Sequence, residues 1–343
     1  MRLEELFVNL LNMSITAGYV VVAVILLRLL LRKAPRWISC SLWALVGLRL
    51  LLPFSFESVM SLIPSSTTVT PDILYSAEPA IGSGVPTVNS VVNPTIAGSL
   101  TPAVTDSASP MQIVISIAGI VWLVGILAMV LYSAVTYVRL RRKVDSAILL
   151  RNNVYKSDAI SSPFVLGIVK PRIYLPFAVG EVDSGYVISH EQTHIRRKDH
   201  WIKPFGFLLL TVYWFNPLMW IAKRKVSDDL ELSCDEAVLE GSDEKIRRKY
   251  AELLLRTAGD GRGYTTCLSA AASSLRYRLK NVITLHRRFA GGVVVGAAML
   301  VLLMGSGSIA LSDSGGTVKE LIFDKAPEEI FIDSVFTYRW NEP

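Results

Sequence analysis

The chain has 343 residues, of which 51% are hydrophobic, and a mean hydropathy of +0.43. This composition excludes an ordinary soluble enzyme and predicts a membrane protein that carries a polar domain. Three cysteines give no disulfide framework. The net charge of +6 is concentrated beside apolar runs, which favours anionic lipid over direct contact with nucleic acid.

Two apolar runs open the chain. Residues 6–31 contain Arg28 as their only charge, and residues 38–54 form a shorter run interrupted by Arg49. A helix of roughly 20 residues crosses a bilayer, so both runs are predicted transmembrane helices. The short link between them holds three basic residues. It is therefore placed in the cytoplasm, where loops are rich in Lys and Arg.

The next stretch, residues 55–110, is rich in Ser, Thr and Pro and contains no Lys or Arg. It is predicted to be a flexible extracellular loop that acts as a connector or as a surface for a partner. Residues 111–138 carry no charge. They are predicted to be the third transmembrane helix.

Residues 139–288 are predicted to be cytoplasmic because they include 26 basic and 16 acidic residues, a difference of +10. In their first part, residues 154–177, β-branched and aromatic side chains are divided by turn residues. This pattern predicts two or three short strands, one of them in a hairpin. We consider two roles for these strands: an edge strand that holds the substrate as an added strand, or a structural sheet that braces the following helix.

That following segment contains His190, Glu191 and His194 in the pattern H-E-x-x-H. On a helix the two histidines lie one turn apart on the same face, where both can bind one metal ion. Neutral imidazole is a good zinc ligand, and a catalytic zinc has three protein ligands and one open position. Glu191 is the candidate general base for a water molecule at that position.

A second predicted helix supplies Glu231 and Asp235. Glu231 would complete a set of two histidines and one glutamate around a single Zn²⁺ ion. Asp235, one turn further on, would accept the free N–H of a ligand histidine and fix its tautomer. Cys234 lies between them and is interpreted as a packing residue, because the catalytic site already has three ligands.

Residues 205–222 are apolar and are flanked by basic residues on both sides. Since the three ligands must meet at one ion, the chain has to return to the same side of the membrane between them. Asn216-Pro217 supplies a break where the segment can turn back. We therefore predict a membrane-dipping or membrane-surface helical hairpin here.

Residues 289–311 are a further uncharged apolar run and the fourth predicted crossing. Residues 312–343 would then form a short extracellular tail, and both termini would be extracellular. The predicted fold class is a mainly α membrane protein. It has four transmembrane helices, a cytoplasmic α+β zinc peptidase domain and a membrane-dipping hairpin.

Four stretches together resemble the BlaR/MecR family of integral-membrane zinc metallopeptidases of bacteria: SPFVLGIVKPRIYLP, HEQTHIRRKDHW, WFNPLMWIA and ELSCDEAVL. The resemblance implies a gluzincin-type peptidase domain in the plasma membrane. It assigns His190, His194 and Glu231 as zinc ligands and Glu191 as base. Members of that family respond to an external signal, cleave themselves near the end of the peptidase domain, and inactivate a cytoplasmic transcriptional repressor.

The sequence departs from the best-known members after the fourth crossing. They carry a large external penicillin-binding domain whose serine lies in an S-x-x-K motif. Here 32 residues follow Leu311, and none of their serines has a lysine three positions later. Sensing of β-lactams is therefore not expected, and the signal would reach the 55–110 loop, the tail or a separate sensor protein.

Three functions remain open. The first is a zinc endopeptidase that relays a signal by cleaving itself or a winged-helix repressor. The second is a transducer that binds zinc structurally and cleaves nothing. The third is a protease for quality control of membrane proteins. The variant Glu191→Ala separates the first two, because only a peptidase needs the base. The expected partners are a protein substrate and membrane lipids, and a homodimer is kept as an alternative assembly.

Overall fold

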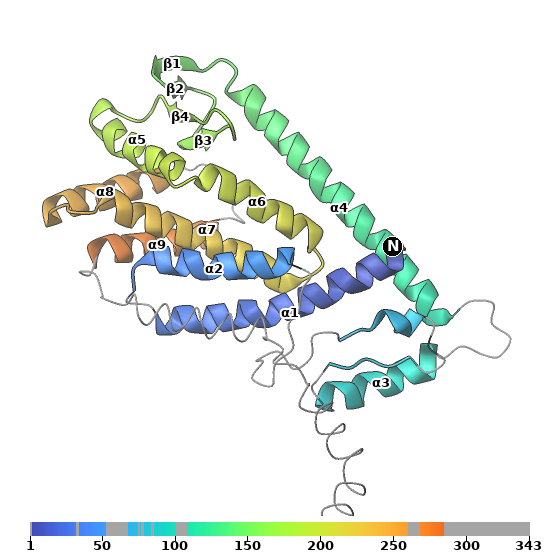
Figure 1. The fold of residues 1–343 in the computed structure, drawn as a ribbon. Coiled ribbons are helices and arrows are strands. Elements are labelled where there is room, and N and C mark those ends of the chain that lie inside the picture. Colours follow the sequence, from blue (N-terminus) through green and yellow to red (C-terminus); the bar gives the residue numbers. More distant parts are fainter. Residues whose placement is uncertain are drawn as a thin grey trace, which may run out of the picture.

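The computed structural model describes residues 2–31, 34–52, 68–74, 76, 79–83, 86–100, 109–259 and 268–284. This part of the chain is mainly helical with one small sheet (Figure 1), as predicted. The helices are α1 (Leu3–Leu30), α2 (Arg36–Leu51), η1 (Pro71–Leu74, a 3-10 turn), α3 (Pro86–Leu100), α4 (Pro110–Lys143), α5 (Glu181–Arg196), α6 (Asp199–Val212), α7 (Pro217–Val238), α8 (Glu244–Gly259) and α9 (Leu268–Ile283). The strands are β1 (Ile148–Arg151), β2 (Val154–Ser157), β3 (Phe164–Leu166) and β4 (Arg172–Pro176).

Two of the described helices are long and apolar enough to cross a membrane, and they coincide with the first and third predicted crossings. Helix α1 has 28 residues and α4 has 34, or roughly 42 Å and 51 Å. Helix α2, at the second predicted crossing, has only 16 residues, or roughly 24 Å, against a hydrocarbon core of about 30 Å. The second crossing, predicted for residues 38–54, therefore stays a prediction. The fourth predicted crossing, residues 289–311, lies outside the described residues.

Part of the predicted flexible loop is helical, so the expectation of a segment without regular structure was wrong for residues 86–100. The side chain of Asn93 accepts a hydrogen bond from the backbone N–H of Ile81 at 2.9 Å. Apolar residues of this region also form a buried cluster with the N-terminal parts of α1 and α4: Val8, Ile73, Leu74, Met111 and Ile115. These contacts are distant in sequence, so the local pattern gave no sign of them.

Helices α6 and α7 form the predicted hairpin, with its turn at Asn216-Pro217. The Asn216 side chain caps α7 by accepting from the N–H of Leu218 at 2.9 Å, and it donates to the Ser14 hydroxyl of α1 at 2.8 Å. The Tyr213 hydroxyl donates to the carbonyl of Leu50 in α2 at 2.9 Å. The turn is thus fixed to α1 and α2. Figure 1 shows α1, α2, α6 and α7 side by side, and a shared apolar core joins them.

Helix α4 contacts the same turn at Gly125. A Cβ atom at this position would clash with the Trp214 indole ring. We expect Gly125→Ala to displace that ring and to lower the free energy of unfolding by about 1–3 kcal/mol, because overpacking forces side chains out of their rotamers. Thermal unfolding in detergent measures this change. Gly206→Ala in α6 is the matched control, since nothing lies within 4 Å of its added methyl group. An equal loss of stability in both variants would contradict the prediction.

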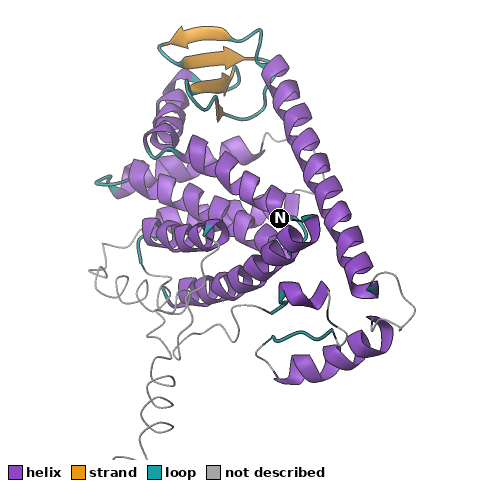
Figure 2. Ribbon diagram, turned by 45° about the vertical axis from the view of Figure 1, so that its right-hand side comes forward, coloured by secondary structure: helices purple, strands orange, loops and turns teal. Residues whose placement is uncertain are grey.

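The sheet has the strand order β1-β2-β4-β3. Strands β3 and β4 form an antiparallel hairpin, while β2 and β4 are parallel. Three of the four strands lie within residues 154–177, in agreement with the sequence analysis. One face packs on α5 through a buried cluster that includes Ile173, Leu175 and Ile188. Figure 2 shows the sheet at the C-terminal end of α4, next to α5. This packing places the edge strand β3 beside the helix that carries the H-E-x-x-H motif.

Candidate metal centre

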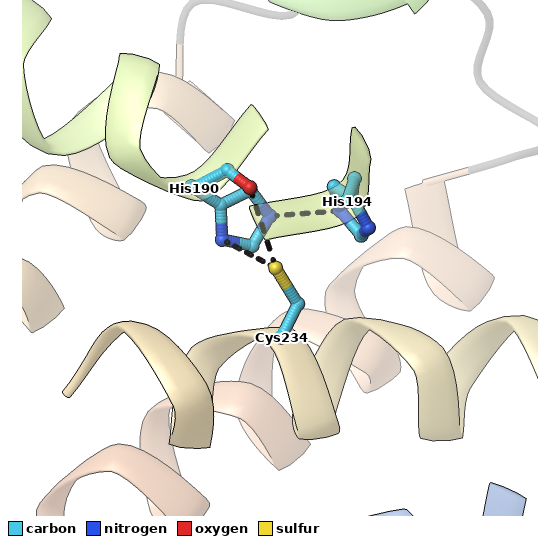
Figure 3. A group of neighbouring side chains, drawn as sticks. All are labelled: His190, His194 and Cys234. Atoms are coloured by element: carbon cyan, nitrogen blue, oxygen red, sulfur yellow. Dashed lines mark hydrogen bonds between the residues drawn. The ribbon is translucent and has the colours of Figure 1, made fainter. Parts of the chain in front are cut away.

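The H-E-x-x-H motif lies in the last two turns of α5, as predicted. His190 and His194 are buried, and their Nε2 atoms are 3.1 Å apart. The two rings meet edge to face with their centroids 4.7 Å apart. Figure 3 shows both imidazoles on the side of α5 that faces α7. The two nitrogens therefore point to one place, as a shared ion requires.

Helix α7 brings Glu231 to the same place. One carboxylate oxygen lies 3.5 Å from Nε2 of His190, and the other lies 3.5 Å from Nε2 of His194. Ligands in a tetrahedron with bonds of about 2.0–2.2 Å are about 3.3–3.6 Å apart. The donor types and the distances between Glu231 and the two imidazoles therefore fit Zn²⁺. The hairpin of α6 and α7 makes this convergence possible, because it returns the chain to α5.

Cys234 is a second group that could complete a metal site. His190, His194 and Cys234 each offer a ligand atom, and these atoms lie within 4.8 Å of one another. The buried Cys234 sulfur is 3.6 Å from Nδ1 of His190 and 3.4 Å from its carbonyl oxygen (Figure 3). It thus approaches His190 at Nδ1, whereas His194 and Glu231 approach it at Nε2. Glu231 is better placed as the third ligand for that reason, and the interpretation of Cys234 as a packing residue stays a prediction.

Asp199 is a functional candidate that the sequence analysis missed. Its carboxylate lies 2.7 Å from Nδ1 of His194, so that Nδ1–H donates to it and Nε2 keeps a free lone pair. A continuous helix would not bring residue 199 back to residue 194. Here α5 ends at Arg196, and Lys198 adopts a left-handed conformation with φ of 62°. This break folds Asp199 onto the imidazole.

The corresponding partner of His190 is Tyr250 in α8. Its hydroxyl donates to the carboxylate of Asp235 at 2.7 Å, and its oxygen lies 2.9 Å from Nδ1 of His190. Asp235 is fully buried, and its own distance to Nδ1 is 3.4 Å. Asp235 therefore lies near Nδ1 of His190, but the Tyr250 hydroxyl is closer to that nitrogen than the carboxylate is. Nδ1–H can donate to the tyrosine oxygen, which leaves Nε2 free.

The acidic groups around the two histidines favour the binding of a cation at this place. Burial lowers the pKa of His190, but contacts with Cys234 and Glu231 outweigh it and raise the pKa to about 9. Burial also opposes protonation of His194, yet Asp199, Cys234 and Glu231 raise its pKa to about 12. The pKa of Glu231 is lowered despite its burial, because its contacts with both imidazoles and the charge of the Lys203 ammonium favour the carboxylate form. The same negative surroundings would stabilise a divalent ion.

Glu191 is also buried, and burial raises the pKa of its carboxyl group. It lines a cavity of about 640 Å³ together with both histidines and Glu231. Phe164 and Val165 of β3 form part of the wall. A carboxylate with a raised pKa is a better acceptor for a proton, and this one faces the space where a substrate would lie.

A mainly helical chain with H-E-x-x-H beside a substrate-sized cavity has the features of the metallopeptidase class. Residues 8–282, most of the chain, match the family described as BlaR1 peptidase M56. The chain therefore belongs to this family of metallopeptidases.

Two curated relatives give the same assignment. The chain is 37% identical over 128 residues to the regulatory protein BlaR1 of Bacillus licheniformis, which covers 36% of this chain and 21% of the relative. It is 32% identical over 104 residues to the methicillin resistance mecR1 protein of Staphylococcus aureus, which covers 29% of this chain and 18% of the relative. The chain thus spans about a fifth of the length of each relative.

Proposed function

We propose that this chain is a zinc endopeptidase of the bacterial plasma membrane that cuts peptide bonds on the cytoplasmic side. It would relay an external signal by cleaving itself, by inactivating a transcriptional repressor, or by both. The observation that carries the proposal is the convergence of His190, His194 and Glu231 beside Glu191 in one cavity. The names of the two relatives, a regulatory protein and a resistance protein, support a role in signalling.

Each residue of the site has a separate task in this mechanism. Zinc, when bound, would polarise the scissile carbonyl and make a water molecule acidic. His190 and His194 present Nε2, because Tyr250 and Asp199 occupy their Nδ1–H groups. The Glu191 carboxylate accepts a proton from that water molecule and then donates it to the nitrogen of the leaving amine.

Strand β3 is proposed to hold the substrate. It pairs with β4 and with no other strand of the described residues, so one of its edges is free for an extended peptide. Phe164 and Val165 line the cavity that contains Glu191. A peptide added to this edge would pass the site in the extended form that exposes its carbonyl groups.

The proposed arrangement in the membrane follows from the apolar helices. Helices α1 and α4 would cross the bilayer together with residues 38–54 and 289–311, with both termini outside. Residues 205–222 would dip into the cytoplasmic leaflet. Membrane lipids and a cytoplasmic protein substrate, such as a winged-helix repressor, are the partners that this arrangement implies. A homodimer is compatible with it.

Comparative proteomics of cells that carry the parent chain or Glu191→Gln tests the activity. We expect fragments of the substrate, or of the chain itself, only with the parent, while both forms purify with one zinc ion per chain. Identical fragments in the two cell lines would refute the peptidase. Intact signalling by Glu191→Gln without any cleavage would instead identify a transducer that binds zinc structurally.

A further inference from the structure

Helix α9 supplies a charged side chain to the centre of the site. It packs against α7 and α8, with Val282 fully buried beside Leu239 and Tyr250. From α9, Arg278 reaches the cavity wall and donates from Nε and Nη2 to the two oxygens of Asp235, both at 2.7 Å. A two-pronged contact of this kind fixes the direction of the carboxylate as well as neutralising it.

Asp235 in turn controls His190. The carboxylate oxygen that accepts from Arg278 Nη2 also accepts from the Tyr250 hydroxyl at 2.7 Å, and the tyrosine oxygen faces Nδ1 of His190 at 2.9 Å. Asp235 is fully buried, so its charge needs a partner. Without the guanidinium, the carboxylate would lose the two hydrogen bonds that fix its direction and would be free to move towards the imidazole. That movement would disturb the hydrogen bond that leaves Nε2 free.

The same guanidinium also contacts the proposed third ligand. Nη1 of Arg278 lies 3.4 Å from one oxygen of Glu231, while the Lys203 ammonium lies 3.0 Å from the other. The Lys203 ammonium acts as a point charge beside one oxygen of Glu231. Arg278 contacts both Glu231 and Asp235, which lie one turn apart on α7, and so it holds their relative orientation.

We propose that Arg278 is a positioning residue of the metal centre. Through Asp235 and Tyr250 it keeps His190 in the tautomer that presents Nε2, so retention of zinc depends on α9 being docked. This proposal rests on the zinc site of the proposed function.

Zinc retention by the purified full-length chain tests the proposal. We expect Arg278→Gln to bind zinc about 10–100-fold more weakly in competition with a chelator, as is usual when a partner of a ligand histidine is disturbed. Arg278→Lys keeps the positive charge but cannot make the paired guanidinium contact with both oxygens of Asp235. Its zinc affinity should therefore lie between those of Arg278→Gln and the parent. Arg276→Gln is the matched control, because this arginine lies on α9 but is exposed. Parent-like affinity in Arg278→Gln would overturn the proposal.

A double-mutant cycle separates positioning from general destabilisation. If Arg278 acts through Asp235, Arg278→Gln should weaken zinc binding little further in an Asp235→Asn background. Fully additive losses would overturn the proposal. The visible absorption of the cobalt-substituted protein should change in Arg278→Gln, and an unchanged spectrum would also count against it. A parent without stoichiometric metal would refute the zinc peptidase itself, whereas the absence of detectable cleavage leaves this test intact.

Discussion

The variant Glu231→Ala is expected to lose its zinc, with an affinity more than about 100-fold below that of the parent, since even partners of ligand histidines contribute about 10–100-fold. Two effects act together. The carboxylate that faces both Nε2 atoms disappears. Lys203 and Arg278, which it neutralises, are then left beside the histidines, where their positive charges oppose a divalent ion.

Measurement of bound zinc also decides between the two candidate third ligands. Cys234→Ala should keep one zinc ion per chain, because its sulfur approaches His190 from the Nδ1 side. The opposite pattern, with zinc lost in Cys234→Ala and kept in Glu231→Ala, would assign the cysteine as ligand. Glu240→Ala is a control for removal of an acidic residue near the end of α7, because it lies outside the cavity.

The parts of the site that could be predicted from the sequence depend on short-range geometry. His190 and His194 are four residues apart, and a helix brings such residues together whatever the rest of the fold does. Glu231 required a further step: the apolar stretch before it had to turn back, and Asn216-Pro217 marked the place. The H-E-x-x-H motif, the break at Asn216-Pro217 and the need for a third ligand were together enough to predict that two segments distant in sequence lie close in space.

The supporting residues could not be predicted in the same way. Asp199 reaches His194 only because Lys198 breaks the helix in a left-handed conformation. Tyr250 and Arg278 come from helices whose packing on α7 is set by the whole domain. Helix α3 was missed for a related reason, since its surroundings are formed by contacts distant in sequence.

The variant Asp229→Ala is expected to lower the free energy of unfolding by about 3–5 kcal/mol, because it leaves the half-buried guanidinium of Arg28 without its partner. Asp229 is fully buried in α7. Arg28 of α1 donates to one of its oxygens at 2.5 Å, and the Trp43 indole of α2 donates to the other at 2.8 Å. Within the described residues, Nε of Arg28 has no hydrogen-bond partner even with the carboxylate present.

Denaturant unfolding of the purified chain measures this loss, and the neighbouring Asp228→Ala serves as control because Asp228 is only half-buried. A loss in Asp229→Ala no larger than in this control would contradict the prediction.

The position of Asp229 two residues before Glu231 adds a second consequence. Removal of both charges in Arg28→Leu/Asp229→Leu should restore stability, because a buried ion pair contributes little compared with apolar residues of similar size. It would not restore the hydrogen bond from Trp43 that helps to orient α7 against α2. We therefore expect the double variant to recover most of the stability that Asp229→Ala loses but to bind zinc more weakly than the parent. Recovery of both properties together would show that Asp229 contributes to stability without positioning Glu231.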